Sequence, residues 1–123
     1  MLINLSNHKS SKWSKEQIEA AENTYGSIVD LEFPVIFPFS DLTEVEQIVE
    51  KYFFKIKNIL IQSKDENNTV HLMGEFTFTH NLLEILKKNN INAVASTTSR
   101  EVCEDKNGTK ISKFNFIRFR NYY

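Results

Sequence analysis

The chain has 123 residues, of which 41% are hydrophobic and 25% are charged, and these values fit one globular domain with a single core. They exclude a chain that is disordered over most of its length. The formal net charge of −1 at pH 7 provides no basic field for a long nucleic acid, although a few local donors could still hold a small anionic ligand.

Apolar runs alternate with helical patterns along most of the chain. Short runs such as residues 2–5 are typical of buried strands, whereas apolar residues that recur every three or four positions are typical of amphipathic helices. Ser14 and Gln17 form a capping box that starts the first helix, and Gly26 is suited to end it. In chain order the pattern predicts a strand at 2–5, a helix from Ser14 to Gly26, a strand at 27–33, a long helix from a cap at Asp41 or Thr43 to Leu60, a strand at 70–73, a helix capped by Thr77 or Thr79, and a strand at 92–96.

The pattern changes near the C-terminus. Residues 100–104 and 109–119 are extended runs that flank the segment Asp105-Lys106-Asn107-Gly108. Asn-Gly between two such runs is a strong signal for a β-hairpin. Residues 1–123 are therefore predicted to form a single α/β domain, a three-layer and mostly parallel sheet with a C-terminal antiparallel β-hairpin.

Polar residues follow each predicted strand. Right-handed crossovers bring the turns after parallel strands to one edge of a sheet, and ligands of such sheets bind at that carboxyl edge. The turns comprise Ser6, Asn7 and His8 after the first strand, Glu32, Phe33 and Pro34 after the second, Gly74, Glu75, Phe76 and Thr77 after the third, and Ser96, Thr97, Thr98, Ser99 and Arg100 after the fourth. We expect these turns to form one ligand-binding site.

Each of these residues also has a purely structural interpretation, because hydroxyls cap turns, carboxylates complement helix dipoles and a lone histidine is more often structural than catalytic. Together, the row of hydroxyl residues before Arg100 and the free N–H groups of a helix after Gly74 favour an anion site. His8 is the candidate for acid or base chemistry near neutral pH. His71 and His80 are weaker candidates, since one lies inside a predicted strand and the other in the first turn of a helix.

Motifs for several other kinds of site are absent. One cysteine and three scattered histidines have no metal-ligand spacing, and there is no G-x-G-x-x-G, P-loop or G-x-S-x-G motif, so we expect neither a metal nor a cofactor. No apolar run is long enough to span a membrane, and the first residues do not form a signal peptide. With Cys103 unable to pair internally, these features indicate a cytoplasmic protein without membrane contact.

Four segments resemble those of small stand-alone CRISPR-associated proteins with a Rossmann-like fold similar to the CARF domain. They are Asn4-Leu5-Ser6-Asn7-His8, Val29-Asp30-Leu31, Met73-Gly74-Glu75-Phe76-Thr77 and Ala95-Ser96-Thr97-Thr98-Ser99-Arg100. The resemblance implies a CARF-like homodimer that binds cyclic oligoadenylate, the second messenger of type III CRISPR defence. Some of these proteins are ring nucleases, which cleave the ring without a metal when a ribose 2′-hydroxyl attacks the adjacent phosphate.

The resemblance also implies roles for individual residues. Arg100 would stabilise charge on the phosphate, Thr98 would assist it, and His8 would transfer a proton, while the other turn residues would bind the ligand. We therefore predict a ring nuclease that binds cyclic oligoadenylate, with cyclic tetra-adenylate as the expected ring, and that switches off type III CRISPR signalling. Two alternatives remain: a non-catalytic cyclic-oligonucleotide binder or regulator, and an unrelated small α/β protein.

Overall fold

The computed structural model describes residues 1–123, and its five strands form one sheet with the order β2-β1-β3-β4-β5. Strands β1 to β4 are parallel, and β5 pairs antiparallel with β4, as the sequence predicted. In chain order the elements are β1 (Leu2–Ser6), a 3₁₀ turn (Ser10–Lys12), α1 (Lys15–Tyr25), β2 (Ile28–Asp30), α2 (Leu42–Ile61), β3 (Thr69–Met73), α3 (Phe76–Lys88), β4 (Asn92–Glu104) and β5 (Lys110–Asn121).

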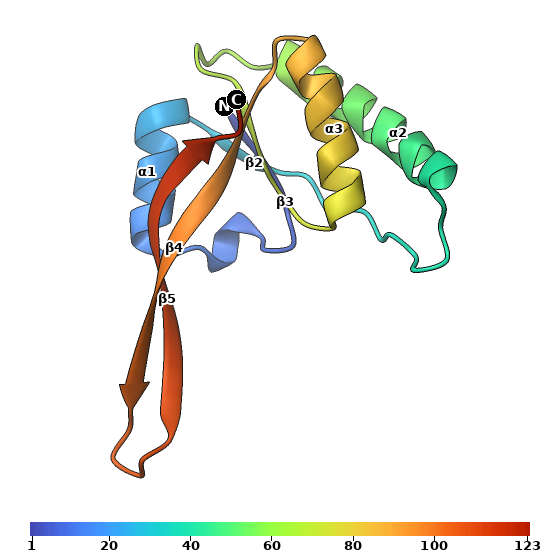
Figure 1. Cartoon of the computed structure of the whole chain (residues 1–123). Helices are drawn as coiled ribbons and strands as arrows, with labels where there is room; N and C mark the ends of the chain where they lie inside the picture. The colour runs from blue at the N-terminus through green and yellow to red at the C-terminus, as the bar shows by residue number, and fades with distance from the viewer.

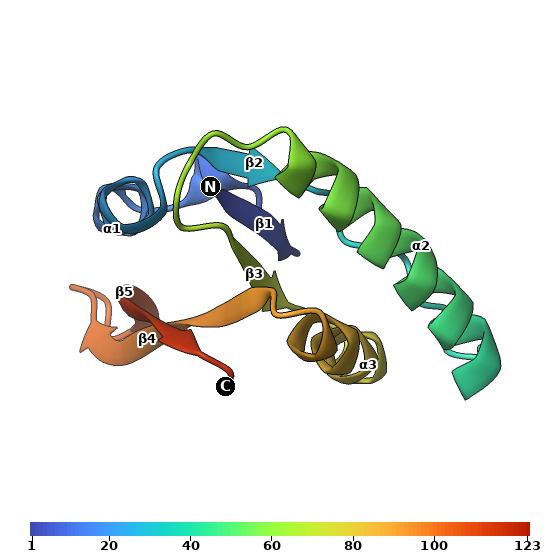
Figure 2. The same ribbon diagram turned by 90° about the horizontal axis from the view of Figure 1, so that it is seen from above.

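Helices cover both faces of the sheet, so the predicted three-layer α/β class is confirmed. Figure 2 shows α1 on one face and α2 and α3 on the other. Strand β1 lies between β2 and β3: the chain passes from it to β2 on one side and later returns to β3 on its other side. This change of direction makes the carboxyl ends of β1 and β3 the topological switch point, where α/β sheets bind ligands.

The two faces of β1 belong to different hydrophobic clusters, because successive strand residues point to opposite faces. Ile3 and Leu5 pack with residues of β3, α2 and α3, whereas Leu2 packs with Ala21 and Tyr25 of α1. The side chains of Leu2, Ile3 and Leu5 are fully buried, and full burial of an aliphatic side chain stabilises a fold by roughly 1.5–3 kcal/mol. Burial on both faces therefore holds β1 in the sheet and keeps its carboxyl end in place.

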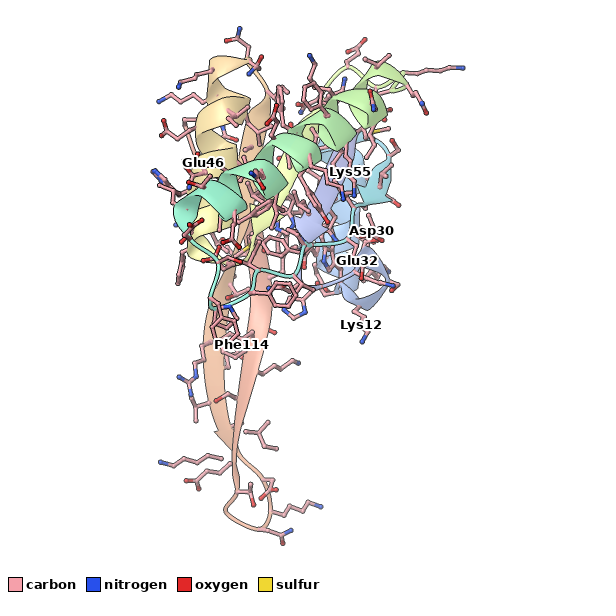
Figure 3. The ribbon with its side chains drawn as sticks, turned by 90° about the vertical axis from the view of Figure 1, so that its right-hand side faces the viewer. Lys12, Asp30, Glu32, Glu46, Lys55 and Phe114 are labelled. Carbon is pink, nitrogen blue, oxygen red and sulfur yellow. The ribbon has the colours of Figure 1, made fainter.

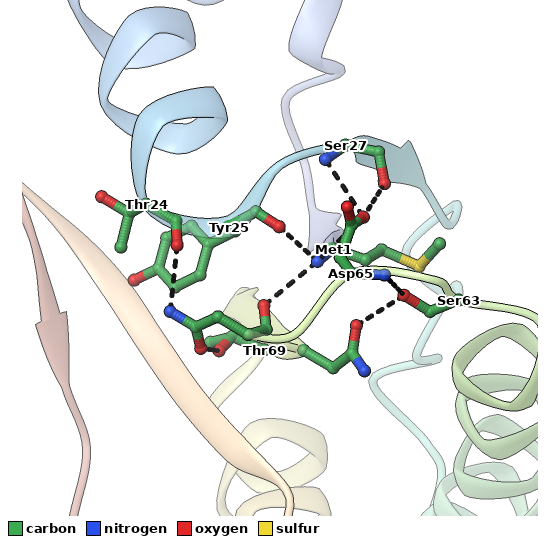
Figure 4. A network of polar contacts seen from close by, with 9 residues as sticks. Met1, Thr24, Tyr25, Ser27, Ser63, Asp65 and Thr69 are labelled. Carbon is green, nitrogen blue, oxygen red and sulfur yellow. Dashed lines mark hydrogen bonds and ion pairs between the residues drawn. The ribbon is translucent and has the colours of Figure 1, made fainter.

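The amino edge of the sheet is closed by a polar network around the N-terminal ammonium group (Figure 4). This group lies 3.2 Å from the carboxylate of Asp65, and it also donates to the backbone oxygens of Tyr25 and Asn67. The Asp65 carboxylate in turn accepts from the hydroxyl and the N–H of Ser27. Loops from three parts of the chain are joined here, which leaves the opposite, carboxyl edge as the open one.

The prediction of a turn at residues 96–100 was wrong. Strand β4 continues without interruption from Asn92 to Glu104, and these residues pair with β5. A bulge between Thr97 and Thr98 shifts the register there. Threonine and serine suit a strand as well as a turn, and no helix follows that would require the strand to end. The pairing of β5 with β4 therefore decided between the two interpretations.

The cap of α3 was also predicted incorrectly. The N-cap is Glu75, whose carboxylate accepts from the backbone N–H groups of Thr77 and Phe78, and neither predicted threonine serves as the cap. Glutamate is an unusual cap, but its negative charge suits the positive end of the helix dipole. By contrast, Asp41 caps α2 as one of the two predicted options, and β2 is shorter than the predicted strand at 27–33.

Strands β4 and β5 extend beyond the body of the molecule as a two-stranded ribbon (Figure 1). Residues 98–114, which we call the hairpin arm, are all exposed, and no third strand pairs with them. The arm carries apolar side chains of which half or more is exposed, including those of Val102, Ile111 and Phe114. Two-stranded ribbons are only marginally stable in water, so this arm lacks the packing partners that the rest of the sheet has.

Glu75→Ala is expected to destabilise the fold by about 1 kcal/mol, because two N–H groups at the start of α3 lose their acceptor. The free energy of unfolding in urea measures this effect. Thr79→Val is the matched control at a predicted cap position, and it should cause no loss, because the Thr79 hydroxyl is buried without a hydrogen-bond partner. Equal destabilisation by both substitutions would contradict the assignment of the cap.

Candidate functional site

A cleft of about 1130 Å³ opens at the carboxyl edge of the sheet, at the switch point between β1 and β3. Its walls come from the ends of β1 and β3, from the middle of β4, from the 3₁₀ turn with the start of α1, and from β5. Figure 3 labels one residue from each side, Lys12 of the 3₁₀ turn and Phe114 of β5. Segments from both ends of the chain therefore meet at this cleft.

The structure brings six of the predicted site residues together in the lining of the cleft. In register, Ser6 lies beside Met73, so the end of β1 and the end of β3 are adjacent. The six residues are Ser6, Asn7, His8, Gly74, Ser96 and Thr98. The prediction that turns far apart in the sequence converge at one edge is thus confirmed for the turns after the first and third strands, together with β4.

The other predicted residues lie outside the cleft lining. They are Glu32, Phe33 and Pro34 of the turn after the second strand, and Glu75, Phe76, Thr77, Thr97, Ser99 and Arg100. Thr97 donates its hydroxyl to the backbone oxygen of Arg118, and Arg100 donates to the hydroxyl of Ser112 at 2.9 Å. Since side chains alternate along β4, Ser96 and Thr98 face the cleft while Thr97 does not. The carboxylate of Glu75 is occupied by the cap of α3.

Gly74 has a packing role at the turn after β3. The ring of Phe33 lies against its backbone, and a Cβ atom at this position would come within 2.3 Å of two ring carbons. The same ring packs edge-on against Phe78, a fully buried residue of α3. The absence of a side chain at Gly74 thus lets the loop after β2 close over the start of α3, next to the cleft.

Two buried polar residues that were not among the predicted site residues lie at the floor of the cleft, and His71 contributes to its lining. Asn4 and His71 are each only 2% exposed, and they pair in register on the neighbouring strands β1 and β3. His71 Nδ1 lies 2.9 Å from Asn4 Oδ1, and His71 Nε2 lies 3.2 Å from the hydroxyl of Ser96. A polar residue within an apolar buried strand needs a partner, so the runs Leu2-Ile3-Asn4-Leu5 and Val70-His71-Leu72 contained the signal that could have revealed this pair.

Aromatic rings surround His71 and keep water from it. Trp13 meets the imidazole edge-on with ring centroids 5.2 Å apart, and Phe119 meets it at 5.6 Å. This desolvation disfavours the charged form and lowers the pKa of His71 to about 4. The imidazole is therefore neutral at physiological pH, and it acts as a fixed hydrogen-bonding group rather than as a cation.

Asp30 holds the 3₁₀ turn that follows β1, which forms one wall of the cleft. Its carboxylate accepts from the N–H and the hydroxyl of Ser10 and, at 2.7 Å, from the amide nitrogen of Asn4. Burial opposes ionisation of this carboxyl, but the hydrogen bonds from Asn4 and Ser10 outweigh it and hold the pKa of Asp30 below its ordinary value. An ionised Asp30 thus ties the 3₁₀ turn to the central strand.

The charges at the cleft are few. Lys12, Lys113 and Glu16 contribute to its lining, and the other polar groups are hydroxyls, amides and histidines. The structure contains no group of three or more His, Cys, Asp or Glu side chains that could hold a metal ion. The lining can therefore supply neutral donors and acceptors, two cations and aromatic surface from Trp13 and Phe116.

The family model described as "Uncharacterized protein MJ1673 family" matches residues 1–120. The chain belongs to this family. The match spans every strand and helix that forms the cleft and reaches almost to the end of β5. The comparison with curated proteins found no match, and the comparison with solved structures found none either. None of the helices has both the length and the apolar character needed to cross a membrane.

Stability is expected to fall by about 2 kcal/mol between pH 7 and pH 5 because of His71. The unfolded chain binds a proton at this residue with the ordinary pKa of 6.5, whereas the folded state does so only near pH 4, so the unfolded state gains protons first as the pH falls. Urea unfolding at several pH values measures this loss. His71→Phe should remove the dependence within this window, whereas carboxylates such as Asp30 lose their contribution only at lower pH. An unchanged pH profile in the variant would show that another group titrates.

Proposed function

We propose that the cleft binds a cyclic oligoadenylate, with cyclic tetra-adenylate as the expected ring, and that the protein cleaves it in the cytoplasm to end type III CRISPR signalling. The observation that carries this proposal is the convergence of hydroxyls, amides, two lysines and aromatic rings in one cleft at the switch point of the sheet. Hydroxyls and lysines suit phosphate and ribose, and aromatic rings suit stacking with bases. The choice of cyclic oligoadenylate as the ligand comes from the resemblance of the turn motifs to those of small CRISPR-associated proteins.

The proposed cleavage needs no metal. The ribose 2′-oxygen attacks the adjacent phosphorus, the bond from phosphorus to the 5′-oxygen breaks, and the product ends in a 2′,3′-cyclic phosphate. His8, which is exposed at the cleft, accepts the proton of the 2′-hydroxyl, and a proton from solvent neutralises the departing 5′-oxygen. Thr98 and Lys12 face the phosphate and stabilise the negative charge that develops on it. In this reaction the protein contributes mainly by positioning the ribose and by stabilising this charge.

A binder that does not cleave is the second candidate, and the place of Arg100 favours it. In the ring nuclease hypothesis Arg100 stabilises charge on the phosphate, but its guanidinium donates to Ser112 on the hairpin arm and lies outside the cleft lining. The cleft of one chain thus lacks an arginine. Without that charge the site would hold the ring and buffer the messenger instead of destroying it.

We also propose that two copies associate through the hairpin arm. The arm exposes Val102, Ile111 and Phe114, which is more apolar surface than a free ribbon should leave in water. It also carries both signs of charge, so that two arms related by a two-fold axis can pair acidic with basic side chains. The charged residues of the arm are Arg100, Glu101, Glu104, Asp105, Lys106, Lys110 and Lys113.

Cyclic tetra-adenylate incubated with excess protein in EDTA should be converted to linear products with a cyclic phosphate end, as followed by chromatography. His8→Ala should slow this conversion at least tenfold with little change in binding. Intact ring that nevertheless stays bound to the protein would favour the non-catalytic binder. A ring that neither binds nor changes would contradict the proposed function.

Lys12→Ala should weaken binding of the ring by about tenfold, since a hydrogen bond to a charged group contributes about 1.5–3 kcal/mol. Lys15→Ala is the matched control, because Lys15 is an exposed lysine three positions along that pairs with Glu19 and does not line the cleft. Titration calorimetry measures both variants. Equal losses would show that the effect is one of overall charge and not of this site.

Light scattering should give a mass twice that of the 14.4 kDa chain. Ile111→Lys places a charge in the arm and should shift the protein towards the monomer. Ile61→Lys is the control, because Ile61 is an exposed apolar residue at the end of α2. Figure 1 shows α2 away from the arm. A monomeric wild-type protein would contradict the proposed dimer, and so would an Ile111→Lys variant that stays dimeric.

A further inference from the structure

A chain of hydrogen bonds runs across four neighbouring strands beneath the cleft, from Asp30 of β2 through Asn4 of β1 and His71 of β3 to Ser96 of β4. The direction of each hydrogen bond can be derived from the chemistry of its ends. Asp30 is ionised and can only accept, and the backbone oxygen of His8 can also only accept. These two acceptors lie 2.7 and 2.8 Å from the same nitrogen of Asn4.

The orientation of the Asn4 amide follows. Its NH₂ group must face the two acceptors, because the reverse orientation would place its oxygen against two other oxygens. The Asn4 oxygen therefore points at His71 Nδ1, at a distance of 2.9 Å. An amide oxygen accepts only, so His71 Nδ1 must carry the hydrogen. In the neutral imidazole the other nitrogen, Nε2, then has a free lone pair.

This tautomer determines the direction of the Ser96 hydroxyl. His71 Nε2 lies 3.2 Å from Ser96 Oγ and can only accept, so the hydroxyl hydrogen of Ser96 points to it. The thioether of Met73 is also 3.2 Å away, but sulfur is a much weaker acceptor than imidazole nitrogen. Ser96 lines the cleft, and with its hydrogen used inside the protein it presents only lone pairs to a ligand.

We propose that Asn4 and His71 are positioning residues that make the Ser96 hydroxyl an obligate acceptor, so that the cleft selects a ligand with a hydrogen-bond donor at this point. The inference rests on the cleft being a nucleotide site. A cyclic oligoadenylate has two kinds of donor that could fill this role, the ribose 2′-hydroxyl and the exocyclic amine of adenine. A ligand that presents only phosphate or ring-nitrogen acceptors here would meet the lone pairs of Ser96 and be rejected.

Three rings test the proposal: cyclic tetra-adenylate, its 2′-deoxy analogue and its inosine analogue, which lacks the amine. The wild-type protein should bind one of the two analogues roughly fivefold more weakly than the parent ring, because a neutral hydrogen bond contributes about 1 kcal/mol. Ser96→Ala should bind that analogue and the parent ring equally well, and Ser96→Thr, which keeps the hydroxyl, should restore the difference. The analogue that is affected identifies the donor.

His71→Phe tests the positioning role, because it keeps an aromatic ring beside Trp13 and Phe119 but offers Ser96 no acceptor. The difference in affinity between the parent ring and the affected analogue should shrink, since the Ser96 hydroxyl can then donate or accept. If His71 had a purely structural role, the substitution would weaken the binding of all three rings alike and leave the ratio of their affinities unchanged. That result would overturn the proposal. A difference between the rings that persists in Ser96→Ala would also overturn it.

The outcome separates this inference from the proposed function. If the wild-type protein binds all three rings with equal affinity, the nucleotide function stands and only the selection by Ser96 is wrong. If it binds none of the three, the nucleotide function is wrong, and the inference fails with it.

Discussion

Asn4 and His71 lie side by side in the two central strands, where every neighbouring residue of those strands is buried. A buried polar group without a partner costs more than a hydrogen bond returns, so each of these side chains requires the other. Their pairing fixes the register of β1 against β3 and, through Asp30 and Ser96, also engages the segments on either side. The alignment of the strand ends at the cleft depends on this polar row.

The two edges of the sheet differ in how completely their polar groups are satisfied. At the amino edge, Asp65 and the N-terminal ammonium group close the loops on one another (Figure 4). At the carboxyl edge, the hydroxyl at the end of β1, the histidine that follows it and the hydroxyls in the middle of β4 face a cleft, and Asp30 holds the 3₁₀ turn in place. Because only one edge is left open, the candidate site is a consequence of the topology and not of any single motif.

Sequence reasoning placed candidate residues at one edge of the sheet where the fold argument was strong, and it failed where it depended on local choices. The hydrophobic periods predicted the order of strands and helices, and this order identified the carboxyl edge of the sheet as the edge where ligands bind. Ser6, His8 and Gly74 lie at that edge. Residues 96–100 were misread because hydroxyl residues suit both turns and strands, and only the partner strand β5 decides between them. His71 ranked low because a position inside a strand suggested packing, whereas it lies directly beneath the cleft.

The sequence by itself determined the α/β class, the element order and the hairpin, because hydrophobic period, capping residues and Asn-Gly act over a few neighbouring positions. Tertiary structure alone decided which side of β4 faces the cleft, which acceptor caps α3 and which nitrogen of His71 carries its hydrogen. These features depend on contacts between residues far apart in the chain, such as Asn4 with His71. Local patterns carry no information about such contacts, since the register between distant strands is set only when the whole sheet assembles.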